Sequence, residues 1–156
     1  MKDLNIREFQ HSDSEAYAHT LLLTLPCDDL DEARENVHIV MERLEKETRE
    51  LWVAESENIQ VGFMLLEFQI QEHNIEIDWF DIHPDYQQRG VGEALVLKAD
   101  ERARTLRYQT ITLHTAASNQ SMRNFAERYG FREEACLPKF WGEDTEDAYL
   151  FMKKLD

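Results

Sequence analysis

The feature that most constrains this chain is a change of hydrophobic period between residues 75 and 106. The stretch IEIDWFDI, residues 75–82, alternates its side chains with the period of two that is typical of a strand. In residues 91–106 the apolar side chains recur every three or four positions, which predicts a helix. A His-Pro pair and two of the five glycines, Gly90 and Gly92, lie between these patterns. A strand that passes through a glycine turn into a helix predicts the start of a β-α-β unit.

The same two periods describe the rest of the chain. Before this unit they predict a strand, two helices and two strands, at residues 4–9, 12–25, 27–47, 51–55 and 59–71. After it they predict a strand, a helix and two strands, at residues 110–115, 119–131, 131–138 and 147–155. Ser12 and Glu15 have the spacing of a capping box for the first helix, and Gly130 closes the last helix as its C′ residue.

We therefore expect a single α/β domain over residues 1–156 with the order β-α-α-β-β-β-α-β-α-β-β. The sheet should be mixed and mostly antiparallel, because short turns join the strands at residues 51–55, 59–71 and 75–82 into a meander. The strands at residues 75–82 and 110–115 should be parallel neighbours, because a helix connects them.

The chain carries a net charge of −15, from 17 basic and 32 acidic residues. This balance disfavours nucleic acid and anionic membranes as partners, since both are bound by basic patches. It is compatible with cationic partners such as amines. The alternative is that the excess acid only keeps the protein soluble. No apolar run approaches the ~20 residues of a membrane span, and the first ten residues lack the apolar core of a secretory signal. We expect a cytoplasmic protein with Cys27 and Cys136 as reduced thiols, and the sequence leaves a homodimer open.

The glycine turn has a chemical interpretation as well as a structural one. Glycines at such a turn let the backbone approach a ligand, and the first N–H groups of a helix have no partner within the helix. Together with the helix dipole they form an anion site suited to phosphate, here with Arg89 beside it. The pattern is neither the dinucleotide fingerprint, since Leu95 takes the third glycine position, nor a Walker A motif. A tight turn that only requires small residues is the alternative.

Two motifs resemble the GNAT acetyltransferase superfamily. Residues 87–92, QQRGVG, match its Gln/Arg-x-x-Gly-x-Gly/Ala motif and follow DIHPDY, a typical apolar-x-Pro approach. The segment NQSMRNFAERYGF from Asn119 is similar to its downstream Asn-x-x-Ala-x-x-Leu-Tyr-Glu-x-x-Gly-Phe segment. Two motifs at the right separation on the right element order are a specific signal. The resemblance covers nearly the whole chain and implies a GNAT-like domain with a β-α-β acetyl-CoA unit.

The resemblance also implies a site for acetyl-CoA as co-substrate. The spacing of His, Cys and Asp residues does not suggest a metal site. The pyrophosphate would be held by the turn, formed by Gln87, Gln88, Arg89, Gly90, Val91, Gly92 and Glu93. Main-chain groups of Phe80, Asp81 and Ile82 would serve the pantetheine arm and the thioester carbonyl, where a donor stabilises the developing charge. Asn119 would contact the pantetheine.

Acetyl transfer to an amine requires a proton acceptor, because an alkyl amine is neutral only about once in 10³ molecules at pH 7. Glu76 corresponds to the catalytic glutamate of the histone-acetylating branch of the family. Asp78, Asp81 and Glu67 are further candidates, and each could instead be an outward-facing strand carboxylate. The tyrosine that often protonates the leaving thiolate is replaced by Ala126, so that Tyr149 or a water would donate. Tyr129 lies on the apolar stripe of its helix and is expected to pack.

The acceptor is expected to be a cationic small-molecule or peptide amine. The two segments that flank the family's acceptor cleft, residues 25–33 and 137–147, combine carboxylates with apolar or aromatic groups, which suits a cation. Both could equally be solvated loops. His83 is expected in an exposed loop. His114 is expected within a strand, as a core residue whose hydrogen bonds are satisfied. A non-catalytic acyl-CoA-binding module is the main alternative function, and an unrelated nucleotide-binding domain fits the element order less well.

Overall fold

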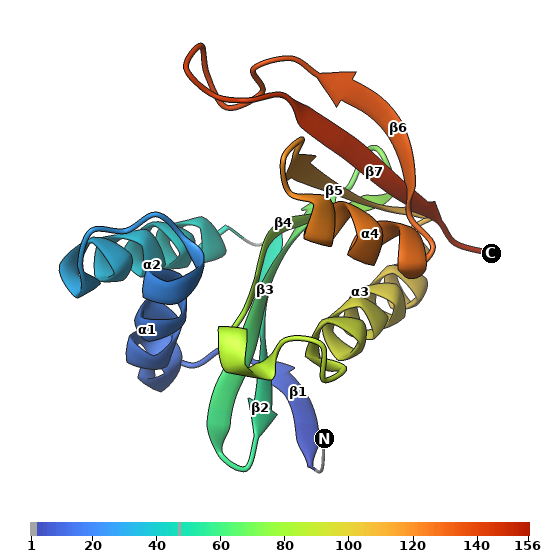
Figure 1. Cartoon of the computed structure of the whole chain (residues 1–156). Coiled ribbons are helices and arrows are strands. Elements are labelled where there is room, and N and C mark those ends of the chain that lie inside the picture. Colours follow the sequence, from blue (N-terminus) through green and yellow to red (C-terminus); the bar gives the residue numbers. More distant parts are fainter. Residues whose placement is uncertain (1–2, 47) are drawn as a thin grey trace. The chain divides into compact units, whose positions relative to one another are not determined.

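The computed structural model describes residues 3–46 and 48–156 (Figure 1). Its strands are β1 (Leu4–Glu8), β2 (Arg49–Ser56), β3 (Ile59–Gln69), β4 (Asn74–Ile82), β5 (Thr110–Ala116), β6 (Arg132–Leu137) and β7 (Ala148–Lys154). Its helices are α1 (Ser14–Thr24), α2 (Leu30–Leu44), α3 (Val91–Leu106) and α4 (Gln120–Arg128), with short 3-10 turns η1 (His11–Asp13) and η2 (Pro84–Tyr86). This α/β element order is the predicted one.

The strands pair in the order β1-β2-β3-β4-β5-β7-β6. β2 is antiparallel to β1 and to β3, and β7 is antiparallel to β5 and to β6. β4 and β5 are parallel, with Glu76 opposite Thr112, so the predicted parallel pairing is confirmed. The chain divides into two compact units, Met1–Glu67 with Trp79–Lys98, and Phe68–Asp78 with Ala99–Asp156, to which we refer as unit 1 and unit 2.

The core of unit 1 lies between α1, α2 and the strands β2 and β3. Apolar side chains on one face of each helix and at alternate strand positions are buried together; they include Tyr17, Leu21, Val37, Val40, Val53, Phe63 and Leu65. The Tyr17 and Phe63 rings stack at 4.1 Å between centroids. α3 approaches the same strands at Gly62, where a Cβ would come within 2.9 Å of Val91 Cγ1. Glycine therefore permits close helix–strand packing at this position.

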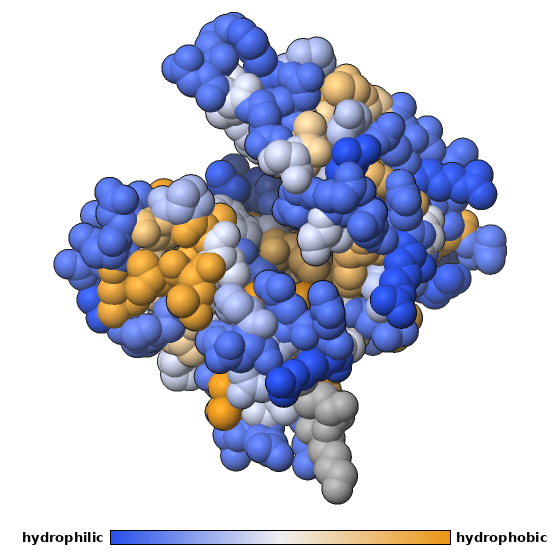
Figure 2. Space-filling view, in the orientation of Figure 1, coloured by the Kyte–Doolittle hydropathy of each residue, from blue (hydrophilic) through white to orange (hydrophobic). Residues whose placement is uncertain are grey.

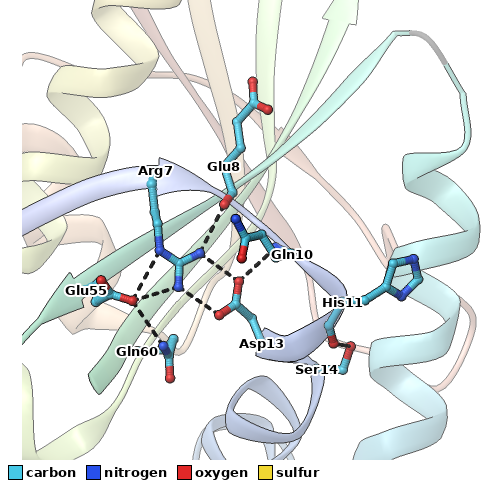
Figure 3. A network of polar contacts seen from close by, with 8 residues as sticks. All are labelled: Arg7, Glu8, Gln10, His11, Asp13, Ser14, Glu55 and Gln60. Carbon is cyan, nitrogen blue, oxygen red and sulfur yellow. Dashed lines mark hydrogen bonds and ion pairs between the residues drawn. The ribbon is translucent and has the colours of Figure 1, made fainter. Parts of the chain in front are cut away.

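A polar network ties β1 to the beginning of α1 (Figure 3). The Arg7 guanidinium donates to both oxygens of Asp13, at 2.8 Å each, and to Glu55 of β2 at 2.7 Å. Asp13 also accepts the Gln10 amide at 2.8 Å. Burial would raise the pKa of Asp13, but the hydrogen bonds from Arg7 and Gln10 outweigh it and lower that pKa.

The predicted capping box of the first helix is wrong in detail. The N-cap of α1 is Asp13, whose side chain makes no hydrogen bond to the helix. Its carboxylate instead accepts hydrogen bonds from the Gln10 amide, at the start of η1, and from Arg7. The chain forms this short 3-10 turn before α1 begins. The helix nevertheless begins within the predicted segment.

The apolar side chains of α1 and α2 are not all covered. Figure 2 shows hydrophobic surface over these two helices. Leu23 of α1 is 57% exposed and Ile39 of α2 is 44% exposed.

Unit 2 contains α4 and the strands β5, β6 and β7, with Ile111, Leu113, Phe131 and Phe151 buried. α4 ends as predicted: Gly130 has φ +92, its amide donates to Glu127 O, and the next amide donates to Ala126 O. These two bonds form a Schellman motif, which glycine at C′ permits. Both cysteines of the chain are free thiols.

Candidate functional site

The glycine turn of unit 1 presents backbone amides at the beginning of α3. Gln88 and Gly90 have positive φ, +60 and +87, and α3 begins at the next residue, Val91. The first hydrogen bond of the helix runs from Ala94 N to Gly90 O at 3.0 Å. The amides of residues 91–93 precede that bond and are the ones that a helix leaves for a ligand. The turn can therefore hold an anion by its backbone.

Side chains around the turn stabilise its shape. Gln87 Nε2 donates to Ile82 O at 3.3 Å, which folds the turn back onto the end of β4. The exposed Arg89 guanidinium lies 5.7 Å from the Tyr86 ring centroid, in cation–π geometry. Arg89 adds positive charge beside the amides, whereas Glu93 in the first turn of α3 is exposed and negative.

Asp81, at the end of β4, is buried against α1. Its carboxylate accepts hydrogen bonds from Tyr17 Oη and Thr24 Oγ1, each at 3.2 Å. Burial raises the pKa of Asp81 to about 6, although hydrogen bonds from Thr24, Tyr17 and Trp79 act in the opposite direction. Asp81 thus links β4 to α1 and carries a carboxyl group that titrates near neutral pH. Its neighbours Phe80 and Ile82 are half-buried.

Glu76 and His114 form a close side-chain pair in unit 2. Glu76 Oε1 of β4 lies 2.8 Å from His114 Nδ1 of β5, and the two side chains are 18% and 19% exposed. Glu76 Oε2 accepts from Gln69 Nε2 at 2.8 Å. Both carboxylate oxygens therefore have a polar neighbour.

A line of side-chain hydrogen bonds continues from Gln69 into the sheet. Gln69 Oε1 accepts from Asn74 Nδ2 at 2.8 Å, and Asn74 Nδ2 also donates to Thr112 Oγ1 at 2.7 Å. Asn74 Oδ1 accepts from Thr110 Oγ1 at 2.8 Å. These bonds determine which end of the Gln69 amide faces Glu76.

The loop between β6 and β7 covers the histidine with an aromatic ring. Phe140 stacks on the His114 imidazole at 4.5 Å between centroids and 13° between planes. Trp141, 51% exposed, packs edge-on against Phe140 at 5.3 Å. The predicted acceptor segment of unit 2 is thus an aromatic surface beside the Glu76–His114 pair.

Several carboxylates of the two predicted acceptor segments are engaged within the chain. Asp29 caps α2 by accepting the Glu32 amide at 2.9 Å, and Asp31 pairs with Arg34 at 2.9 Å. Glu143 pairs with Lys139 at 2.9 Å. These surface contacts are weak and leave the carboxylates in water, so a cation could still compete for them.

The remaining predicted site residues of unit 2 lie on β7 and on α4. Tyr149 is on β7, with the Arg123 guanidinium 4.3 Å from its ring centroid. Asn119 is the N-cap of α4 and accepts the Met122 amide at 3.1 Å through Oδ1. Ala126 is buried in α4, and Tyr129 is half-buried with its ring 4.7 Å from that of Phe125.

The sequence alone indicated no chemical role for His114. The parallel pairing of β4 and β5, which the sequence predicts, could have indicated that His114 lies near Glu76. Glu76 is opposite Thr112, and His114, two positions further, points to the same face of the sheet.

Comparison with known proteins identifies the family. The model of the acetyltransferase (GNAT) family matches residues 8–131. The chain belongs to the GNAT acetyltransferase family. GNAT enzymes use acetyl-CoA, and the turn at Gly90 lies within the matched residues. No curated protein sequence matches the chain.

Solved structures of GNAT proteins share the fold at low sequence identity. A point mutant of spermidine N-acetyltransferase from Vibrio cholerae is 20% identical with a TM-score of 0.78, over 99% of this chain and 95% of that one. The ribosomal-protein-S18-alanine N-acetyltransferase of Escherichia coli is 17% identical with a TM-score of 0.79, over 98% and 94%. A GNAT acetyltransferase from Elizabethkingia anophelis with acetyl-CoA bound is 19% identical with a TM-score of 0.77, over 99% and 100%.

Residues 3–46 and 48–156 contain no group of three or more His, Cys, Asp or Glu side chains that could hold a metal ion. Over the same residues, none of the helices combines the length and apolarity needed to cross a membrane.

Proposed function

We propose that this chain is an N-acetyltransferase that moves an acetyl group from acetyl-CoA to a primary amine. The observation that carries this proposal is the turn at Gly90, whose left-handed backbone leads into the free amides of α3 within the residues that match the family. We further propose that residues 1–156 act as one cytoplasmic acetyltransferase domain.

The backbone amides of the turn are chemically suited to bind the pyrophosphate of acetyl-CoA. A chain with a net charge of −15 repels anions in general, and backbone amides at a helix N-terminus bind phosphate without basic side chains. Residues 87–93 would hold the pyrophosphate, with Arg89 as an added cation. The main chain of Phe80, Asp81 and Ile82 would serve the pantetheine arm and the thioester carbonyl, and Asn119 the pantetheine.

The reaction proposed is direct attack of the amine on the thioester. The amine nitrogen bonds to the carbonyl carbon, the carbon–sulfur bond breaks, and the amine loses a proton with the help of a carboxylate or a water. Glu76 is our first candidate for the carboxylate that assists, and Asp81, with a pKa of about 6, is the second. Tyr149 or water would protonate the thiolate, which is a fair leaving group because a thiol pKa is about 8.5.

A cationic acceptor is proposed from charge and aromatic surface. The exposed Trp141 and the ring of Phe140 offer faces that attract a cation, and the acidic balance of the chain favours its approach. Related structures include enzymes named for spermidine and for a ribosomal protein. Their diversity leaves both a small-molecule amine and a peptide amine as candidates.

The test is acetyl-CoA turnover on a panel of amines. Purified protein is incubated with acetyl-CoA and, in turn, a polyamine, an aminoglycoside, free amino acids and peptides with a free lysine or N-terminus, while thiol release is followed. We expect amine-dependent release with cationic acceptors, and acceptance of only neutral or anionic compounds would overturn the electrostatic argument.

The second candidate function is a non-catalytic acyl-CoA-binding regulatory module. Ala126, at the position of the family's frequent tyrosine acid, favours it. Acetyl-CoA binding by calorimetry without turnover on any amine of the panel would support this candidate. Absence of acetyl-CoA binding would overturn both candidates.

A further inference from the structure

A buried carboxyl group fastens the C-terminal end of α1 to β4 within unit 1. Asp81 is 6% exposed, and its two oxygens lie 3.2 Å from the hydroxyls of Tyr17 and Thr24. The Trp79 side chain is its third hydrogen-bond partner. These three partners are uncharged, so an ionised Asp81 is a buried charge that none of them neutralises.

The hydroxyl of Thr24 has two acceptors but only one hydrogen. Thr24 Oγ1 lies 3.1 Å from the carbonyl oxygen of Thr20, one turn earlier in α1, and 3.2 Å from Asp81 Oδ1. If Thr24 donates to Thr20 O, its contact with Asp81 needs a hydrogen on the carboxyl group, which only the neutral acid carries. If Asp81 is ionised, Thr24 must turn its hydrogen toward the carboxylate and away from Thr20 O. Both contacts are hydrogen bonds only when Asp81 is neutral.

This contact lies at the point where α1 passes into the segment that leads to α2. Thr24 is the last residue of α1, and the Leu25 amide closes the helix by donating to Leu21 O at 2.8 Å. Residues 25–29 connect this end to the beginning of α2 at Leu30, and they are part of the predicted acceptor segment of unit 1. The Asp81–Thr24 contact therefore holds the first residues of that segment.

We propose that Asp81 is a proton-controlled latch for the C-terminal end of α1. As a neutral acid it donates to Thr24, which donates to Thr20 O, and the last turn of the helix is held against β4. When the proton passes to water, Thr24 turns toward the carboxylate, water enters to solvate the buried charge, and residues 24–29 open more often. The latch lies within unit 1 and does not depend on acetyl transfer.

The protonation of Asp81 falls in a pH range where such a latch responds. Burial raises the pKa of Asp81 from 3.8 to about 6. The closed latch binds the proton more tightly than an open one in which Asp81 meets water, so its stability is lost as the pH rises through 6. If the open state has the ordinary pKa of 3.8, opening increases about tenfold between pH 5 and pH 8.

Other ionisable groups lie on the elements packed around the latch. They are Glu15 and His19 of α1, Arg43 of α2, which lies over the Trp79 ring, and His83 and Asp85 at η2, which packs against α1. The hydrogen bonds of Asp81 given above involve none of this set. Because histidine titrates near neutral pH, His19 and His83 each need a control variant.

Amide hydrogen exchange of the unaltered protein and of Asp81→Asn tests the latch. Exchange is followed by NMR at pH 5 and pH 8, and each rate is compared with the intrinsic rate of the free peptide at that pH. Protection of the Leu25 amide should fall about tenfold from pH 5 to pH 8 in the unaltered protein. Asparagine resembles the neutral acid, with an NH₂ donor for Thr24 and a carbonyl for Tyr17, so Asp81→Asn should stay protected at both pH values. An equal fall in Asp81→Asn would overturn the inference.

Two substitutions of Thr24 separate the hydrogen bond from packing. Thr24→Val keeps the shape of the side chain without its hydroxyl, whereas Thr24→Ser keeps the hydroxyl. Thr24→Val should lower the protection of the Leu25 amide at pH 5 to the level of the unaltered protein at pH 8, and Thr24→Ser should keep the pH step. If Thr24→Val behaved like the unaltered protein at both pH values, the hydroxyl would hold nothing and the latch would be refuted.

His83→Asn and His19→Gln are the controls for the neighbouring histidines. Asparagine at position 83 keeps a side-chain acceptor for the Asp85 amide, which His83 Nδ1 provides at 3.2 Å. The pH step should persist in both variants, with its midpoint at the titration of the Asp81 carboxyl carbon followed by ¹³C NMR. Loss of the step in either variant would assign it to that histidine instead. If no amine is acetylated, only the proposed function fails, because the exchange measurement needs no turnover.

Discussion

Glu76 Oε1 lies 2.8 Å from His114 Nδ1, although the two residues belong to different strands that are joined only through α3. Their contact follows from the parallel register of β4 and β5, which places both side chains on one face of the sheet. The second carboxylate oxygen of Glu76 accepts a hydrogen bond from Gln69 of β3. Glu76 therefore contacts the side chains of both neighbouring strands.

Gly90→Val should abolish acetyl-CoA binding while the fold is kept. Gly90 has φ +87 and open space where a Cβ would point, so the change strains the backbone rather than the packing, by about 1–3 kcal/mol. Relief of that strain moves the amides that would hold the pyrophosphate. Calorimetry with acetyl-CoA and thermal unfolding measure the two effects.

Gly130→Val is the matched control for that substitution. Gly130 has φ +92, nearly the same backbone, at the end of α4. It should lose a similar amount of stability and retain acetyl-CoA affinity. If both variants lost acetyl-CoA affinity equally, backbone strain at any position would weaken binding, and the turn at Gly90 would have no specific role.

Asp81→Asn should stabilise the protein above pH 6. The pKa of Asp81 is raised from 3.8 to about 6, so the folded state binds a proton more tightly than the unfolded state. Stability is therefore lost as the pH rises through this window, by up to about 3 kcal/mol. Asparagine does not titrate and can still bond to Tyr17 and Thr24. Denaturant unfolding at pH 4 and pH 8 should show near-equal stabilities at the lower pH and a more stable variant at the higher.

Arg7→Gln should destabilise unit 1, because it leaves the buried Asp13 carboxylate without its guanidinium partner. We expect a loss of about 1–3 kcal/mol at pH 7. The lowered pKa of Asp13 means that its stabilising contribution is present at neutral pH and is lost as the pH falls. The cost of Arg7→Gln should therefore shrink in acid. Arg34→Gln, at an exposed pair, should change unfolding far less.

Tyr149→Phe tests the proposed thiolate donor. If Tyr149 donates, kcat should fall by about tenfold, a modest loss because the thiolate leaves readily and water can substitute. Tyr129→Phe removes a hydroxyl from a ring that packs on Phe125 and should leave kcat unchanged. Equal rates for both variants and the unaltered enzyme would assign the proton to water.

Phe140→Leu should weaken binding of a cationic acceptor. The substitution removes the ring that stacks on His114 and with it part of the proposed aromatic surface, so KM for the amine should rise. Trp141→Leu removes the ring that packs edge-on against Phe140 and should raise KM as well. An unchanged KM in both variants would mean that these rings do not form the acceptor surface.

Local patterns were sufficient to predict the elements and the glycine turn. The period of the apolar residues indicates which face of an element is buried, so it predicted the order of strands and helices. Glycines between two such segments indicate a turn, and Gly90 has the positive φ of such a turn. The parallel pairing of β4 and β5 was also predictable from the sequence, because two strands joined through a helix usually lie parallel in the same sheet.

The partners of the side chains were decided only by the tertiary structure. The sequence by itself identified Glu76 and Asp81 as strand carboxylates but did not distinguish their environments. Burial against Tyr17 and Thr24 of α1 raises the pKa of Asp81, whereas Glu76 meets His114 and Gln69 from other strands. The pKa of a side chain and its hydrogen bonds depend on neighbours that are distant in sequence. Strand register determines those neighbours, and the pattern within a single strand does not specify the register between strands.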